Sequence, residues 1–98
     1  MNFKKWSRLS DDEQRMRCQS LNPYEQWPLF KSIEEAFVKE FGELPGVERV
    51  FCGFGSGVGP YSAITVTIKK GAPRTKLPEY FMGFPVVREY ASKQSSKG

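Results

Sequence analysis

Histidine and cysteine usage restricts the chemistry open to this chain more than any motif does. The 98 residues contain no histidine and two cysteines, Cys18 and Cys52. Without imidazole the chain cannot form a Ser-His-Asp or Cys-His catalytic arrangement or a His-ligated metal site. Two thiols fall short of a four-cysteine zinc site, and nothing in the sequence brings two carboxylates together for acid–base chemistry. We therefore expect a non-enzymatic protein with no catalytic residue, no metal and no cofactor.

Residues 53–60 form a glycine-rich segment with a glycine at every second position. Consecutive backbone N–H groups in such a loop can cradle an anion, here through Gly55, Gly57 and Gly59. The segment lacks the lysine of a Walker A loop and the glycine spacing of a dinucleotide-binding motif, and Pro60 leads into a strand rather than a helix. We favour a wide hairpin connection whose glycines supply positive φ angles, with anion or nucleotide binding as an alternative.

A basic connection over residues 69–76 is a second binding candidate. Four positive charges in a loop can follow the phosphate backbone of single-stranded RNA or DNA, and an aromatic side chain nearby can stack a base. A solvated loop without a partner and a contact with an acidic protein are the other two interpretations. The residues that would bind nucleic acid are Tyr61, Lys69, Lys70, Arg74 and Lys76.

Charge and hydropathy define the broad class. The net charge is +4, with an acidic stretch over residues 34–48 and a basic excess after Val50. No apolar run approaches the roughly 18–20 residues of a membrane helix, and charged sequence rather than an apolar stretch follows the first six residues. Two widely separated cysteines indicate reduced thiols. These features predict a cytoplasmic protein without a membrane span.

The elements that must position these residues begin with helices. Residues 1–9 form a basic arm that we expect to be flexible. Ser10 is a capping residue followed by three acidic residues, which predicts a short helix at about 11–20. Apolar residues at helical spacing predict the main helix from Pro28 to about Phe41, ended by Gly42.

Three strands follow, at about 47–54, 61–69 and 84–90. In the second strand Ile64, Val66 and Ile68 alternate with polar residues, a pattern typical of a sheet with one buried face. We predict a two-layer α+β domain over residues 10–90, in which the N-terminal helices pack on a three-stranded, mainly antiparallel sheet. Residues 91–98 are rich in serine and lysine and are expected to be a disordered tail.

The second half also resembles a known kind of domain. It contains Gly53-x-Gly, then Ala63-Ile64-Thr65-Val66, then Leu77-Pro78 and Gly83-Phe84-Pro85-Val86. This order over residues 47–90 resembles small bacterial α+β accessory domains that are sometimes found beside chymotrypsin-like protease domains. The resemblance implies an αβββ-type accessory module without chemistry of its own.

We therefore expect a small module that binds another macromolecule, either a protein partner or a second copy of itself. Single-stranded nucleic-acid binding through the 69–76 loop and anion binding at the glycine-rich loop are the alternatives. The residues expected to contact a protein partner are those that an isolated fold needs least. They are Phe3, Trp6, Trp27, Ser56 and Val58.

Overall fold

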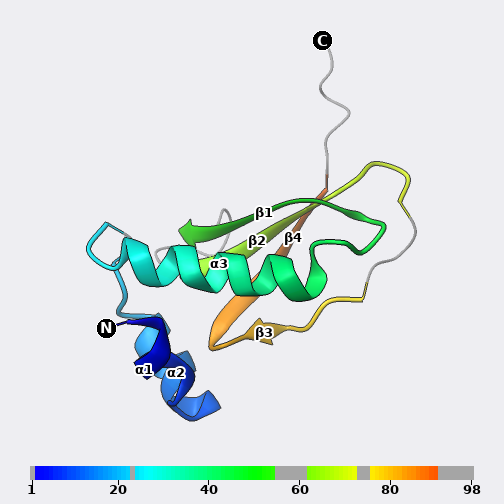
Figure 1. Cartoon of the computed structure of the whole chain (residues 1–98). Coiled ribbons are helices and arrows are strands. Elements are labelled where there is room, and N and C mark those ends of the chain that lie inside the picture. Colours follow the sequence, from blue (N-terminus) through cyan, green and yellow to red (C-terminus); the bar gives the residue numbers. More distant parts are fainter. Residues whose placement is uncertain (1, 23, 55–61, 73–75, 91–98) are drawn as a thin grey trace.

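The computed structural model of this chain describes residues 2–22, 24–54, 62–72 and 76–90 (Figure 1). Within these residues three helices precede four strands, which confirms the predicted α+β class. The elements are α1 (Phe3–Ser7), α2 (Asp11–Cys18), α3 (Trp27–Phe41), β1 (Val47–Phe54), β2 (Ser62–Ile68), β3 (Tyr80–Phe81) and β4 (Phe84–Tyr90).

Helix α1 lies where the sequence predicts a flexible arm. The Asn2 side chain begins this helix, because its Oδ1 accepts a hydrogen bond from the Lys5 backbone N–H at 2.8 Å. One turn of helix is marginal by itself, and burial of an aromatic residue stabilises it. Trp6 supplies that burial, since its side chain has no exposed surface. Residues 3–7 are thus joined to the core rather than separate from it.

Helix α2 begins at the capping residue that the sequence indicates. Ser10 Oγ accepts a hydrogen bond from the Glu13 backbone N–H at 3.2 Å, and three acidic residues occupy the first turn. A side-chain cap and acidic groups at a helix N-terminus each stabilise the helix. The helix ends at Cys18, two residues before the predicted end.

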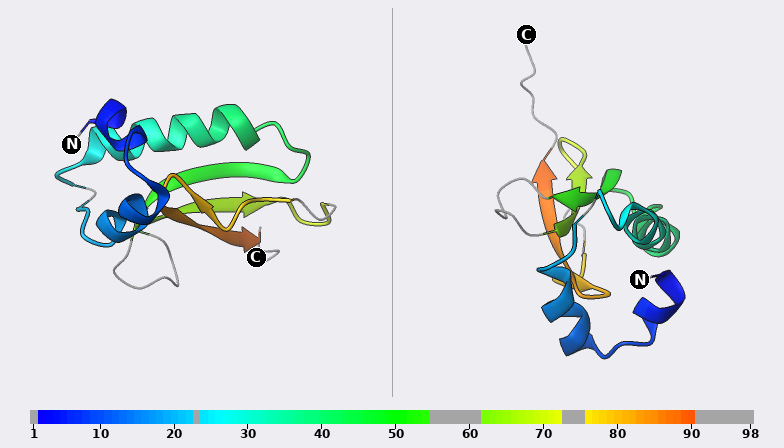
Figure 2. Two further views of the ribbon diagram at one scale, coloured as in Figure 1. Left: turned by 90° about the horizontal axis from the view of Figure 1, so that it is seen from below. Right: turned by 90° about the vertical axis from the view of Figure 1, so that its left-hand side faces the viewer.

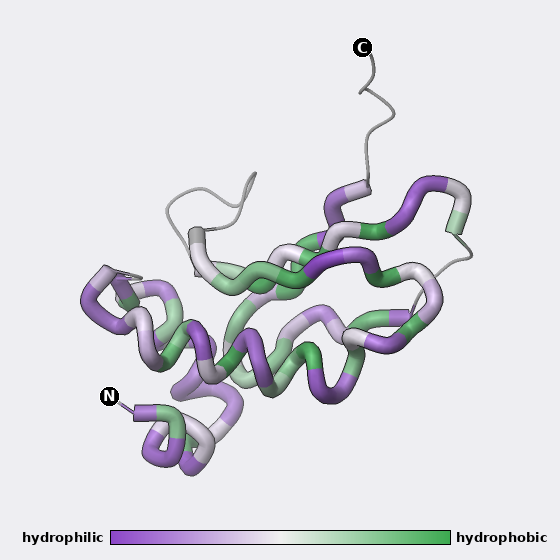
Figure 3. Tube along the Cα trace, turned by 45° about the horizontal axis from the view of Figure 1, so that its top comes forward, coloured by the Kyte–Doolittle hydropathy of each residue, from purple (hydrophilic) through white to green (hydrophobic). Residues whose placement is uncertain are grey.

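Helix α3 matches the sequence prediction to within one residue. It begins at Trp27 with Pro28 in its first turn and ends before Gly42. Figure 3 shows hydrophilic and hydrophobic residues alternating along its turns, as expected of a helix with one buried face. Its buried side chains are Leu29, Phe30, Ile33 and Phe37.

The sheet is four-stranded and mixed, in the order β1-β2-β4-β3. Strand β1 pairs antiparallel with β2, and the two-residue β3 pairs antiparallel with β4. Strand β4 runs parallel to β2, with Ile64 opposite Val86 and Ile68 opposite Tyr90. The sheet therefore differs from the predicted three-stranded, mainly antiparallel sheet in having β3 as an additional strand and in the parallel pairing of β4 with β2.

The cause of that difference is the connection over residues 69–83. A parallel pair needs a crossover of roughly a dozen or more residues, and this connection is long enough to return to the other end of the sheet. It also contributes β3 as an edge strand before the chain turns into β4. Composition and periodicity do not report strand direction, so this arrangement is a property of the tertiary fold.

Helix α3 lies along one face of the sheet, with α1 and α2 beside one end (Figure 2). The aromatic side chains of three elements meet at Phe84, the first residue of β4. Its ring centroid lies 5.3 Å from that of Phe30 and 5.8 Å from that of Trp6. These tilted and edge-on contacts stabilise the end of the molecule where α1, α3 and β4 meet.

Candidate functional site

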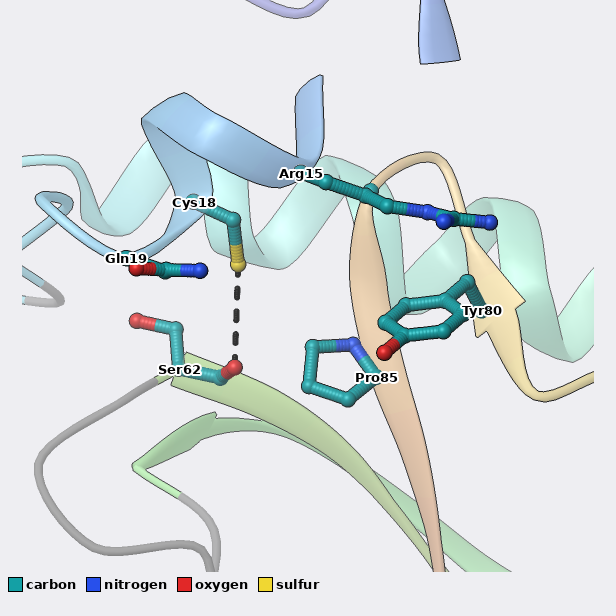
Figure 4. Close-up of a pocket in the computed structure, with 7 residues that line it drawn as sticks. Arg15, Cys18, Gln19, Ser62, Tyr80 and Pro85 are labelled. Atoms are coloured by element: carbon teal, nitrogen blue, oxygen red, sulfur yellow. Dashed lines mark hydrogen bonds between the residues drawn. The ribbon is translucent and has the colours of Figure 1, made fainter. Parts of the chain in front are cut away.

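A pocket of about 250 Å³ lies between α2, the start of β2 and the β3–β4 hairpin (Figure 4). Its lining combines one guanidinium group, one carboxamide, one hydroxyl and one thiol with the aromatic and proline rings of the hairpin. Pockets that enclose a drug-sized ligand have volumes of about 300–1,000 Å³. The volume of this pocket corresponds to one or two amino-acid residues. The lining residues are Arg15, Cys18, Gln19, Ser62, Tyr80, Gly83 and Pro85.

The β3–β4 turn holds one wall of the pocket in place. Met82 and Gly83 have φ angles of 52° and 89°, the combination that a tight two-residue hairpin connection requires. The Met82 carbonyl accepts a hydrogen bond from Trp6 Nε1 at 2.8 Å, and Gln14 Nε2 donates to the Trp6 carbonyl at 2.8 Å. A Cβ placed on Gly83 would lie 2.5 Å from the Gln14 backbone carbonyl carbon. The turn, α1 and α2 therefore form one packed unit.

Ser62 contributes a buried hydroxyl group that no described residue pairs with. Its side chain has no exposed surface, and Oγ has no hydrogen-bond partner in the described part of the chain. Its backbone carbonyl accepts a weak hydrogen bond from Cys18 Sγ at 3.6 Å. Figure 4 shows the hydroxyl directed away from that bond, on the side where Gln19 lies. Burying a hydroxyl without a partner costs about 1–3 kcal/mol, so the position favours a ligand that would satisfy it.

Arg15 provides the positive charge of the pocket. Its guanidinium carbon lies 4.1 Å from the centre of the Tyr80 ring, a cation–π contact that joins α2 to β3. No carboxylate among the described residues pairs with Arg15. Arg17, on the same helix, differs because its Nη2 lies 3.6 Å from Glu13 Oε2. Arg15 is therefore the arginine of α2 that is available to an anionic ligand.

The two thiols are poor nucleophiles in this environment. Both cysteines are free and buried. Burial raises the pKa of Cys18 from 9.0 to about 12, and burial is also the main cause of the raised pKa of Cys52. Thiolate is the reactive form, and its fraction at neutral pH is negligible when the pKa is this high. Cys18 therefore acts as a neutral wall of the pocket.

The residues expected to contact a protein partner have different positions. Trp6 is fully buried and hydrogen-bonded to Met82, so the expectation of an exposed Trp6 on an arm is wrong. Phe3 is partly buried and packs against the core. Trp27 is 45% exposed at the start of α3 and stays a candidate for a partner contact.

Three lysines of the basic segment are exposed: Lys69, Lys70 and Lys76. They lie beyond the end of β2, whereas the pocket lies at its beginning. Tyr90 is exposed at the same end, opposite Ile68, with 68% of its surface accessible. The remaining candidates lie outside the described residues, namely Gly55, Ser56, Gly57, Val58, Gly59, Tyr61 and Arg74.

Sequence reasoning missed the pocket residues. One signal was present, because the period-two pattern of β2 places Ser62 on the same face as Ile64 and Val66. A serine on an otherwise apolar, buried face indicates a polar group that needs an explanation. No comparable sequence pattern indicates that Arg15 and Tyr80 line the same pocket, because these residues are far apart in sequence.

Neither a metal-binding cluster nor a membrane-spanning helix is present among the described residues. They contain no group of three or more histidine, cysteine, aspartate or glutamate side chains placed to hold a metal ion. Among the described helices, none has the length and apolar character needed to cross a membrane. Comparisons of the chain with protein-family models, with curated proteins and with solved structures gave no match.

Proposed function

We propose that this chain is a non-enzymatic binding module whose pocket between α2 and the β3–β4 hairpin accepts a segment of a partner protein. The observation that carries the proposal is the buried Ser62 hydroxyl, which has no hydrogen-bond partner among the described residues. A folded protein that retains such a group loses stability, and a bound ligand that hydrogen-bonds to it recovers that loss.

The size and rigidity of the pocket support a protein segment as the occupant. A volume of about 250 Å³ accommodates a short stretch of chain rather than a nucleotide or flavin. The wall formed by the hairpin is held by the hydrogen bond from Trp6 to Met82 and by the close approach of Gly83 to Gln14. A pre-formed site lowers the entropic cost of binding. The protonated thiol of Cys18 supports binding rather than covalent chemistry.

A peptide-display selection tests this function. Random peptides would be selected against the full chain, and enriched peptides would be measured by isothermal titration against wild type, Ser62→Ala and Gln19→Ala. We expect enriched peptides whose affinity falls by about tenfold in each variant, the effect of losing one or two hydrogen bonds. Failure to enrich peptides, or equal affinity for all three proteins, would overturn the proposal.

A second candidate function is single-stranded nucleic-acid binding at the other end of the sheet. One observation favours it: the exposed ring of Tyr90 lies opposite Ile68, the residue that precedes Lys69 and Lys70. An aromatic ring can stack a base while neighbouring lysines contact phosphates. This surface shares no residue with the pocket, so the two functions can be tested separately.

Fluorescence polarisation of labelled single-stranded RNA at low and moderate salt tests the second function. Binding through phosphates weakens steeply as salt rises, because counterions are released on binding. We expect the affinity to fall with salt and to fall again in Tyr90→Ala and in Lys69→Ala/Lys70→Ala. Absence of binding at low salt would exclude this function, and Arg15→Gln serves as the matched control that leaves RNA binding unchanged.

A further inference from the structure

The polar groups of the pocket are separated into two sets, which constrains the shape of its occupant. Figure 4 shows the Arg15 guanidinium beside the Tyr80 ring on one side and Gln19 with the Ser62 hydroxyl on the other. Cys18 and Pro85 lie between the two sets. A compact ion satisfies one set only. An occupant that satisfies both sets must be elongated, with an anionic group at one end.

The Arg15 side of the pocket is suited to a carboxylate. The guanidinium carbon lies 4.1 Å from the centre of the Tyr80 ring, and a guanidinium group carries a fork of N–H donors along its edge. That edge matches the two oxygens of a carboxylate, with which arginine forms paired hydrogen bonds. No acidic side chain among the described residues occupies this position.

The other side of the pocket is suited to a peptide group. A hydroxyl and a carboxamide each donate and accept hydrogen bonds, so Ser62 and Gln19 together can satisfy both the N–H and the C=O of a backbone. Neither side chain has a hydrogen-bond partner among the described residues. The rings of Tyr80 and Pro85 provide an apolar surface for the atoms between the backbone and the carboxylate.

We propose that the pocket recognises an extended acidic segment of a partner protein. An aspartate or glutamate side chain of that segment binds Arg15, and its backbone binds Gln19 and Ser62. This inference rests on the proposed function and adds the chemistry of the partner. A free C-terminal carboxylate and a small carboxylic acid are competing ligands that the experiment distinguishes.

The test is an NMR titration of the full, ¹⁵N-labelled chain with capped peptides. The first probe is an N-acetylated, C-amidated tripeptide of valine, glutamate and valine, and its matched control has glutamine in place of glutamate. We expect the glutamate peptide to shift the Arg15 Nε–H and Gln19 side-chain signals. Its affinity should exceed that of the glutamine peptide by about 2- to 5-fold, the range for an ion pair with an exposed arginine.

Two variants on the same helix localise the effect. Arg15→Gln should remove the preference for glutamate over glutamine, whereas Arg17→Gln should retain it, because Arg17 pairs with Glu13 and does not line the pocket. Equal affinities of the two peptides for wild type would overturn the acidic preference and leave the binding function intact. If neither peptide shifts the NMR signals of the pocket residues, the result would contradict the proposed function as well.

The last part of the experiment compares the competing ligands. Acetate and a valine tripeptide with a free C-terminus would be titrated in the same way. Stronger binding of either one than of the internal glutamate peptide would overturn the assignment to an internal acidic residue.

Discussion

Replacing Gly83 with alanine tests whether α2 packs on the β3–β4 turn as described. The φ angle of Gly83 is 89°, a conformation that L-residues rarely adopt. Its missing side chain also faces the backbone of α2, since a Cβ would lie 2.5 Å from the Gln14 carbonyl carbon and 2.7 Å from its oxygen. Backbone atoms cannot rotate away as a flexible side chain would. The alanine must therefore displace the turn or the helix.

The magnitude follows from two separable terms. A left-handed conformation costs a non-glycine residue about 1–2 kcal/mol, and overpacking costs about 1–3 kcal/mol. Together we expect Gly83→Ala to lower the free energy of unfolding by about 2–5 kcal/mol, out of a total of about 5–15 kcal/mol for a domain of this kind. Tm should fall by at least about 8 °C.

Gly71 provides the matched control. Its φ angle is 76°, but a Cβ there would meet no atom within 4 Å. Gly71→Ala should therefore cost about 1–2 kcal/mol, the conformational term alone. Urea denaturation followed by tryptophan fluorescence measures both variants, since Trp6 is buried and Trp27 is partly exposed. Equal losses in the two variants would refute the close packing of Gly83 on α2.

Three further predictions concern the core, the thiols and the pocket. Trp6→Phe should lower the free energy of unfolding by about 2–4 kcal/mol, because it leaves a cavity and removes a buried hydrogen bond. Trp27→Phe should lower it by less than about 1 kcal/mol. Equal losses of unfolding free energy in the two variants, measured by denaturation followed by circular dichroism, would contradict the burial of Trp6. Because burial raises the pKa of Cys18 from 9.0 to about 12 and also that of Cys52, the unfolded chain loses thiol protons first as pH rises. Stability should be complete below about pH 9 and should then fall by up to about 1.4 kcal/mol per pH unit for each thiol. Urea denaturation between about pH 8 and pH 10 should show no such decrease in unfolding free energy for the Cys18→Ala/Cys52→Ala protein. The same pH dependence in the wild type and in this variant would argue against the thiols as the cause. Ser62→Ala removes a buried hydroxyl that has no partner among the described residues, so it should leave the free energy of unfolding unchanged or raise it by about 1–2 kcal/mol while weakening peptide binding. A decrease of more than about 1 kcal/mol would indicate that Ser62 Oγ forms a hydrogen bond in the folded protein.

Local signals in the sequence located most of the helices and strands. The cap at Ser10 begins α2, and Pro28 and Gly42 mark the limits of α3. Strands β1 and β4 have the predicted bounds, and β2 differs from its prediction by one residue at each end. Capping, proline geometry and side-chain periodicity act between residues close in sequence, so the sequence alone reports them.

The candidate site was not predictable in the same way. The wall of the pocket depends on the hydrogen bond between Trp6 and Met82, which are 76 positions apart, and on the contact of Arg15 with Tyr80. The buried position of Trp6 and the two-residue β3 depend on the same long-range packing. Neither the Trp6–Met82 hydrogen bond nor the Arg15–Tyr80 contact is visible in the periodicity or composition of the sequence.

The sequence by itself determined the α+β class, the amphipathic α3 and the absence of imidazole chemistry. Only the tertiary structure decided the parallel direction of β4, the burial of Trp6 and the meeting of Arg15, Gln19 and Ser62 in one pocket. The physical reason is that backbone propensity and side-chain period are local properties. Strand direction and convergence of side chains instead arise from packing and hydrogen bonds between residues that are distant in the chain.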